Sequence, residues 1–281
     1  MFSQVWNSCH ASICHLNFLN ERGASVDSLT GFKVNNFLVT CQQAFYVEKT
    51  QKVEITFVGV DANTPSATLK IPYAEFIKEH RIGVFNNNGH YAVFNIDLPE
   101  FESIPGLKLS EDHSFSIGSQ VAVLAFNGGC SNLSLTTGTI SSLKTNSQGI
   151  HFIQFDGNTY FGNSGAPLID PKTKQVIGIV SRRTTPAACA YKQLMNIISS
   201  NIDELKGVES KVKFGEIDPI QVLIANQNQL KHLATNIYKH SVSSNSQAVT
   251  LDRIISFFYE NTNFQQEDKV QSEEEIDLYV R

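Results

Sequence analysis

The stretch Phe161-Gly162-Asn163-Ser164-Gly165-Ala166-Pro167-Leu168 is the most informative part of the sequence. It places a serine next to glycines and directly before an apolar run that is typical of a buried strand. Glycine adopts backbone angles that other residues avoid, so Gly162 and Gly165 predict a tight turn around Ser164. In such a turn the N–H groups of Gly162 and Ser164, which flank Asn163, can converge on one oxygen atom. That arrangement is an oxyanion hole, which stabilises a tetrahedral acyl intermediate.

Short apolar runs broken by turn residues surround this stretch from residue 12 to residue 181. This pattern is typical of a β-sandwich or β-barrel. The runs that predict strands cover 12–19, 31–34, 37–40, 53–60, 92–96, 120–126, 135–143, 151–155, 166–169 and 176–181. So many strands exceed one small sheet, and we expect an all-β fold of two packed barrels.

The composition changes after residue 190, where helical periodicity replaces the short runs. Helices are predicted over 191–205 and 218–240, the second with Asp218 as N-cap and Pro219 at its first position. The apolar stripe of the second helix predicts a hairpin packed on the barrel, although a partner-binding helix is the alternative. A last strand over 247–251 and a closing helix over 252–259 follow. The expected divisions are 1–190, the main barrel part; 191–243, the helical insert; 244–262, the last strand and helix; and 263–281, an acidic disordered tail.

The chain has 281 residues, a net charge of −5 and a pI near 5.9, which argue against nucleic acid as a partner. No run reaches the roughly 18 apolar residues that a membrane span needs. Five cysteines without a signal peptide predict free thiols and a cytoplasmic protein. Cys9-His10 and Cys14-His15 lack a second pair at metal-binding spacing, so no metal or other cofactor is expected.

The serine stretch resembles the nucleophile loop of the trypsin-like serine peptidases, including their bacterial heat-shock members. Ile153-Gln154-Phe155-Asp156 before the loop and the strand 176–181 after it match the flanking strands of that family in order and spacing. The resemblance extends over about 12–181 and resumes at 247–251. It implies a double β-barrel in which Asp156 and Asn158 wall the primary specificity pocket. It also implies that Ser181 opens the strand that pairs with a bound peptide.

Two of the three catalytic positions depart from the family. The run Gly31-Phe32-Lys33-Val34 continuing to Leu38-Val39-Thr40 matches the strands before the catalytic histidine, and Gln43 stands at the histidine position. The strand that the family opens with an aspartate begins here with His90. An amide at Gln43 cannot accept the proton of Ser164 near neutral pH, so the serine would keep the weak nucleophilicity of an alcohol. In the family, loss of triad function lowers the rate by about 10⁴ to 10⁶.

Three functions remain open on this basis. In the first, which we favour, the chain is a catalytically impaired peptidase homologue whose cleft binds a peptide or protein partner by strand addition. In the second, it is an active serine endopeptidase in which His90, or another histidine such as His151, serves as base. In the third, it is a scaffold or bacterial effector that acts through the helical insert. The block Glu273-Glu274-Glu275 before the apolar C-terminus resembles secretion signals of bacterial type IV effectors, which implies delivery to a host cell without a signal peptide.

Overall fold

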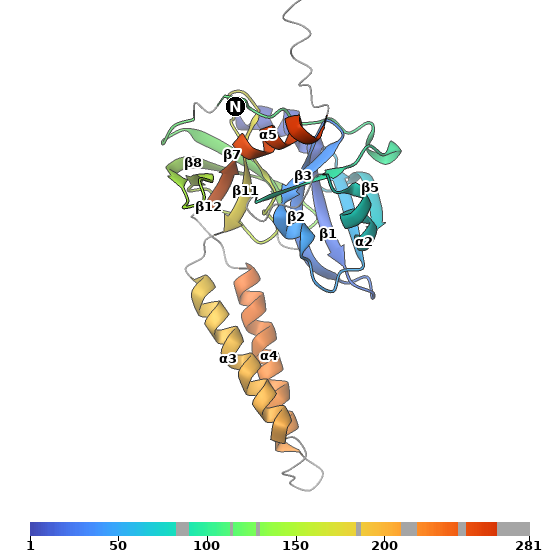
Figure 1. Cartoon of the computed structure of the whole chain (residues 1–281), viewed down its shortest axis with the longest axis vertical. Helices are drawn as coiled ribbons and strands as arrows, with labels where there is room; N and C mark the ends of the chain where they lie inside the picture. The colour runs from blue at the N-terminus through green and yellow to red at the C-terminus, as the bar shows by residue number, and fades with distance from the viewer. Residues whose placement is uncertain are drawn as a thin grey trace, which may run out of the picture.

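Two β-units lie side by side in the computed structural model, and a pair of long helices extends away from them (Figure 1). The structure describes residues 1–82, 90–112, 115–127, 130–183, 187–208, 218–240 and 246–262. The predicted fold class is confirmed: the chain is mostly β, with an inserted helical hairpin and a C-terminal helix, and agrees with a trypsin-like double barrel.

The first unit is a six-stranded sheet in the order β5-β4-β1-β2-β3-β6. Its strands are antiparallel and have the bounds β1 Ile13–Leu19, β2 Ser25–Val34, β3 Phe37–Cys41, β4 Lys52–Val58, β5 Pro65–Pro72 and β6 Tyr91–Asn95. Short helical turns connect or flank these strands: Gln42–Phe45, α2 Tyr73–Glu75, Phe76–His80 and Pro99–Phe101. The turn Gln42–Phe45 follows β3 directly and carries Gln43.

The second unit is a closed barrel in the order β10-β11-β12-β9-β8-β7. Its strands have the bounds β7 Gln120–Phe126, β8 Leu133–Thr145, β9 His151–Phe155, β10 Pro167–Ile169, β11 Val176–Arg183 and β12 Ser246–Thr250. β12 pairs with β11 on one side and β9 on the other, so the strand after the hairpin completes the barrel. The serine loop connects β9 to β10.

Strand β7 explains how the two units pack together, because both of its faces are buried. Val121, Val123 and Ala125 point into the barrel interior. The alternate residues Ala122, Leu124 and Phe126 join a second core that also contains apolar residues of β1, β2 and β3. The period of two along a strand therefore gives this strand one face for each unit.

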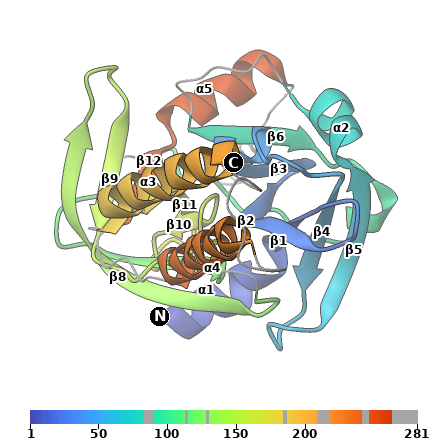
Figure 2. The ribbon, with the colours of Figure 1, turned by 90° about the horizontal axis from the view of Figure 1, so that it is seen from below.

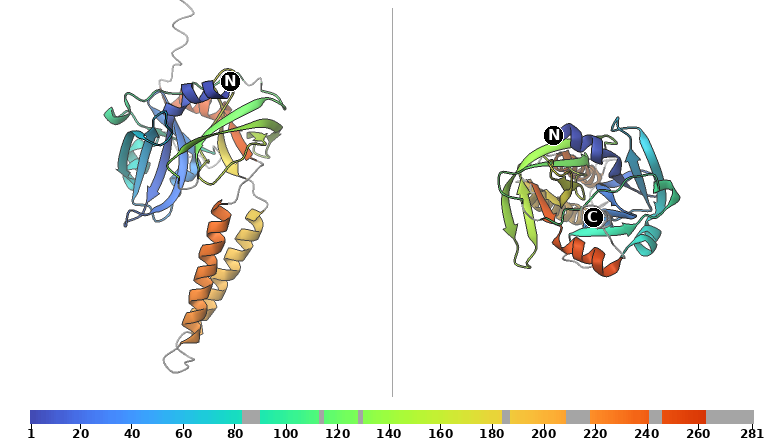
Figure 3. Two further views of the ribbon diagram at one scale, coloured as in Figure 1. Left: turned by 180° about the vertical axis from the view of Figure 1, so that it is seen from behind. Right: turned by 90° about the horizontal axis from the view of Figure 1, so that it is seen from above.

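Two helices cover the junction from opposite sides (Figure 2, Figure 3). The N-terminal helix α1, Phe2–Cys9, buries Val5 and Cys9 in the shared core. The C-terminal helix α5, Asp252–Asn261, buries Ile254 and Phe258 in the same core. The predicted closing helix is therefore confirmed, whereas α1 was not expected from the sequence.

The inserted hairpin consists of α3, Ala187–Val208, and α4, Pro219–His240. Asp218 caps α4 as predicted, since its Oδ1 accepts the N–H of Ile220 at 2.8 Å. The prediction that the hairpin packs on the barrel is wrong, because the two helices project away from it (Figure 1). On α4, Ile220 and Ile224 are partly buried, but Leu230 and Ile237 of the predicted packing stripe are 44% and 63% exposed.

Candidate active site

The loop that carries Ser164 lies where the first sheet meets the barrel. From the first sheet, the N–H of Thr30 donates to the carbonyl oxygen of Ser164 at 3.0 Å, and the Thr30 hydroxyl donates to the carbonyl of Gly162 at 2.8 Å. From the barrel, the N–H of Gly165 donates to the carbonyl of Val180 on β11 at 2.7 Å. Hydrogen bonds from both units therefore fix the backbone on either side of the serine.

Among residues 162–166, two N–H groups have no acceptor within the described part of the chain. Those of Asn163, Gly165 and Ala166 all donate to backbone carbonyls. Within the described part of the chain, the N–H groups of Gly162 and Ser164 donate to none. Gly162 has a φ of +94°, a conformation that favours glycine. The unpaired donors are the two that the sequence predicts for an oxyanion hole around Asn163.

The side chain of Asn163 anchors the loop to the barrel. It is 2% exposed, and its Nδ2 donates to the carbonyl of Phe126 and to Oδ1 of Asn127, both at 2.9 Å. Its Oδ1 accepts the N–H of Tyr160 at 2.7 Å. The side chain of Asn163 thus positions the backbone next to Ser164, because both of its polar atoms are engaged in these hydrogen bonds.

Gly165 allows the first sheet to approach the loop closely. A Cβ at this position would lie 2.2 Å from both the carbonyl oxygen of Thr30 and the hydroxyl of Thr40, and 2.9 Å from the backbone nitrogen of Cys41. Gln43 follows Cys41 by two residues, in the turn after β3. The loop of Ser164 and the segment of Gln43 are therefore neighbours across the junction.

Gln43 and His90 line one cavity of about 520 Å³. The backbone of His90 is tied to the residue before Gln43, since its N–H donates to Oε1 of Gln42 at 3.1 Å and its carbonyl accepts the Gln42 N–H at 3.4 Å. The His90 ring packs edge-on against Phe152, with centroids 5.3 Å apart. Gln43 is exposed, and Ser164, partly buried, is not among the residues that line this cavity.

Among the described residues that line this cavity, Cys41 is the one sulfur nucleophile, and its surroundings keep it protonated. Burial raises the pKa of the Cys41 thiol to about 12, and its Sγ lies 3.6 Å from Oε1 of Gln43. A thiolate is the reactive form of cysteine. Cys41 is therefore a buried structural thiol rather than a replacement for the serine.

The three residues expected to bind substrate differ in their surroundings. Asp156 is exposed, and its Oδ1 accepts the N–H of Thr139 at 2.5 Å, which engages this carboxylate with the neighbouring strand. Asn158 is also exposed. Ser181 lines the cavity with Gln43 and His90, and its Oγ is buried without a hydrogen-bond partner among the described residues.

Several cavity residues were not identified from the sequence. Gln42, Phe152 and Gln247 line the cavity together with Lys144, Thr145 and Asn146. Gln247 is on β12, a strand that the hairpin separates from the rest of the barrel in sequence. Gln42 could have been identified from its position next to Gln43. Gln247 and Phe152 could not, because only the closure of the barrel brings them to the cavity.

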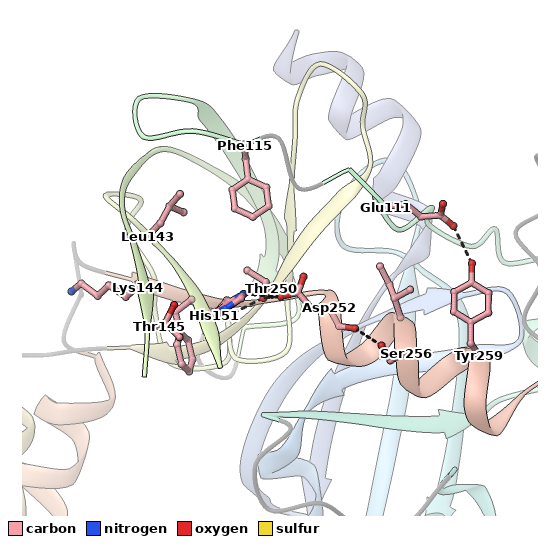
Figure 4. A pocket seen from close by; sticks show the side chains of 12 residues that line it. Glu111, Phe115, Leu143, Lys144, Thr145, His151, Thr250, Asp252, Ser256 and Tyr259 are labelled. Carbon is pink, nitrogen blue, oxygen red and sulfur yellow. Dashed lines mark hydrogen bonds and ion pairs between the residues drawn. The ribbon is translucent and has the colours of Figure 1, made fainter. Parts of the chain in front are cut away.

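His151, named as an alternative base, lies in another pocket, which has a volume of about 840 Å³ (Figure 4). Its Nδ1 is 3.0 Å from Oδ2 of Asp252, and that oxygen also accepts the hydroxyl of Thr250 at 3.0 Å. Gln43, His90 and Ser164 do not line this pocket. The pair of His151 and Asp252 fastens β9 to the start of α5.

The described residues offer neither a metal site nor a membrane span. In these ranges, no three side chains of His, Cys, Asp or Glu lie close enough together to hold a metal ion. None of the described helices combines the length and apolar character required to span a bilayer. The acidic tail, 263–281, lies outside the described residues.

Residues 30–179 match the family model described as "Trypsin-like peptidase domain". A variant of the HtrA-type protease AlgW solved with a tripeptide is similar in structure, with a TM-score of 0.52 and 16% identity over 66% of this chain and 56% of that one. A serine endoprotease from Yersinia pestis gives a TM-score of 0.50 and 16% identity over 66% of this chain and 58% of that one. Comparison with curated proteins gives no match. The chain thus spans little more than half of these proteases, and the likeness concerns the fold.

Proposed function

Because the chain belongs to the trypsin-like peptidase family, we propose that it is a catalytically impaired member whose cleft binds an extended peptide or protein segment without cutting it. The observation that carries this proposal is Gln43. It is exposed and lines the cavity beside His90, and the resemblance of residues 31–40 to the family's strands assigns it to the histidine position. A neutral amide has no basic lone pair that takes a proton from an alcohol at pH 7, so Ser164 lacks a general base.

The serine loop is consistent with retained binding. The unpaired N–H groups of Gly162 and Ser164 offer two donors for a carbonyl oxygen. A ligand carbonyl there would receive ground-state hydrogen bonds, and such contacts do not by themselves accelerate a reaction. The donor pair therefore serves a binding protein as well as an enzyme.

The edge of β11 provides the second element for peptide binding. On its β10 side, β11 is paired up to Val180, whose N–H donates to the carbonyl of Ala166 at 2.8 Å. No described strand pairs with that side of residues 181–183. An extended peptide can add to such an open edge through main-chain hydrogen bonds, with Ser181 at the start of the contact.

Rebuilding the missing base and its partner tests this proposal. We expect no measurable hydrolysis of casein or short peptide substrates by the unmodified chain. Gln43→His alone should raise the rate of hydrolysis only slightly, because a neutral or cationic His90 cannot orient and stabilise the new imidazole as a carboxylate does. Gln43→His with His90→Asp should gain hydrolysis over the unmodified chain, and a further Ser164→Ala should remove that gain.

Two outcomes would contradict the proposal. Hydrolysis by the unmodified chain that Ser164→Ala abolishes would indicate an active peptidase with a rearranged base. Peptides from a library of extended sequences should bind the unmodified chain and the Ser164→Ala variant equally. If none binds either protein, as measured by fluorescence polarisation, the cleft has no peptide-binding role.

A further inference from the structure

The helical hairpin exposes more apolar surface than its own packing covers. Each apolar side chain in question is between 37% and 63% exposed: Leu194 and Ile197 on α3, and Leu223, Leu230, Leu233 and Ile237 on α4. A contiguous apolar surface on a polar helix pair commonly marks an interaction site. The arrangement of these residues determines which partner fits.

The two helices already have a well-defined contact with each other. The rings of Tyr191 and Tyr238 are stacked with centroids 4.2 Å apart, and the Tyr191 hydroxyl lies 3.1 Å from that of Thr235. Further along α3, Ile198 and Ile202 are buried. These residues define a seam that faces the other helix and leaves the remaining surface of each helix available.

The exposed apolar residues form a stripe at a constant angle from this seam. Five of the six directly precede a residue on the seam side of their helix: Leu194 before Met195, Ile197 before Ile198, Leu223 before Ile224, Leu233 before Ala234 and Ile237 before Tyr238. The sixth, Leu230, precedes the exposed Lys231 and belongs to the stripe by its spacing of seven residues from Leu223 and Ile237. One residue corresponds to a rotation of about 100° around a helix axis. Because the helices are antiparallel, the same backward rotation on each turns both stripes to the same side of the pair. We call this side, defined by the six exposed residues named above, the apolar face of the hairpin.

We propose that the apolar face is the interface of a homodimer, in which the hairpins of two copies form an antiparallel four-helix bundle. The spacing on α4 is symmetric about Leu230, because Leu223 lies seven residues before it and Ile237 seven residues after it. An end-over-end rotation about Leu230 therefore brings Leu223 of one copy to the level of Ile237 of the other. A two-fold interface requires this kind of self-complementary surface.

The charge of the face also fits a second copy. The remaining stripe positions between the apolar residues are Asn201 and Asn226, both uncharged. Glu204 is the first charged residue of the α3 stripe, and it lies near the far end of that helix. Depletion of charge at the centre of a contact is typical of protein interfaces. Two identical faces can thus meet centrally without like charges opposing each other.

The size of the face is adequate for a stable dimer. Each helix has 22 residues, which corresponds to about 33 Å of length. Two helices packed side by side are about 20 Å wide, so the contact would bury roughly 650 Å² on each copy and about 1,300 Å² in total. That total falls within the range of specific interfaces. End-over-end pairing also separates the two double barrels, because each hairpin projects away from the double barrel of the same copy (Figure 1).

Sedimentation velocity of the full chain tests the dimer over about two decades of concentration. We expect a species of twice the 31.2 kDa chain mass for the unmodified protein. Leu230→Glu with Leu233→Glu should halve the mass, because two carboxylates per copy would then oppose each other at the centre. Asn196→Asp with Asn228→Asp adds the same charge on exposed positions that lie on the opposite side of each helix from the face, and should leave the dimer intact.

A monomeric unmodified chain at all concentrations, or a dimer that survives Leu230→Glu with Leu233→Glu, would overturn the proposal. Cross-linking provides a second measurement that does not depend on charged variants. With Cys130 and Cys189 replaced by serine, Leu230→Cys should form a covalent dimer with a short bismaleimide, because it lies near the two-fold axis. Asn228→Cys, on the opposite side of α4, should not, and cross-linking at Asn228 without cross-linking at Leu230 would contradict the assigned face.

Discussion

The serine loop and the segments that face it across the junction differ in how their residues are held. In the loop, the side chain of Asn163 is anchored to the barrel, and Gly165 lies against Thr30 and Thr40 of the first sheet. On the other side, Gln43 is an exposed side chain in a short turn, and its Oε1 accepts a hydrogen bond from the Cys41 thiol at 3.6 Å. Replacing a loop residue disturbs the fold, whereas replacing Gln43 changes mainly chemistry.

This difference explains how a nucleophile loop can persist in a member of the family with an incomplete triad, which is what we propose for this chain. The bonds made by Thr30 to Gly162 and Ser164 hold the sheet against the barrel whether or not the serine reacts. Stability alone therefore accounts for the presence of the loop, and its presence does not indicate catalysis. Whether the chain is an active enzyme depends on Gln43 and His90, and the fold should tolerate substitutions at these two positions more easily than in the loop.

Gly165→Ala should have the largest effect on stability. The new methyl group would overlap the carbonyl oxygen of Thr30 and the hydroxyl of Thr40, each 2.2 Å away, at a φ of +89°. We expect a loss of about 3 kcal/mol or more in the free energy of unfolding, measured by urea denaturation.

Gly118→Ala is the matched control for that substitution. Gly118 has a φ of +92°, but a Cβ there meets no atom within 4 Å. It should cost about 1 kcal/mol, since only the backbone conformation is unfavourable. Equal losses for both variants would mean that the close approach of sheet and loop does not stabilise the protein.

Asn163→Ala should have a smaller but clear effect. It leaves the N–H of Tyr160 and the carbonyl of Phe126 without their side-chain partner in a buried place. We expect a loss of about 2 kcal/mol in the free energy of unfolding. The exposed Asn158→Ala should change it by less than about 0.5 kcal/mol. A comparable loss of stability in Asn163→Ala and Asn158→Ala would mean that the hydrogen bonds of the Asn163 side chain do not anchor the loop.

Much of the fold was predictable because local patterns and tertiary structure agree. Most expected strands are present, and Asp218 with Pro219 marked the start of α4 correctly. The edge strand β5 was not predicted from the sequence, since only Ala67, Leu69 and Ile71 alternate with polar or exposed positions and a proline stands at each end of the strand. Helix α1 was also missed, although Phe2, Val5, Trp6 and Cys9 have helical spacing.

The hairpin shows where sequence periodicity is insufficient. An apolar stripe indicates that a helix buries one side but does not identify what covers it. In α4, Ile224 turns toward α3 while Leu233 of the neighbouring stripe is 56% exposed. For the candidate site, the sequence assigned Gln43, His90 and Ser164 to one cleft; Gln43 and His90 line one cavity, and Ser164 is not among its lining residues. Gln247 and Phe152 could not be assigned from the sequence, because barrel closure brings them to the cavity.

The reactivity of Ser164 toward a fluorophosphonate probe tests the central claim most directly. Such probes label serines whose hydroxyl is activated by a neighbouring base. We predict no labelling of the purified, unmodified chain, and labelling of the Gln43→His with His90→Asp variant under the same conditions. Labelling of the unmodified chain that is lost in Ser164→Ala would contradict the account, because it would show that a base other than residue 43 activates the serine.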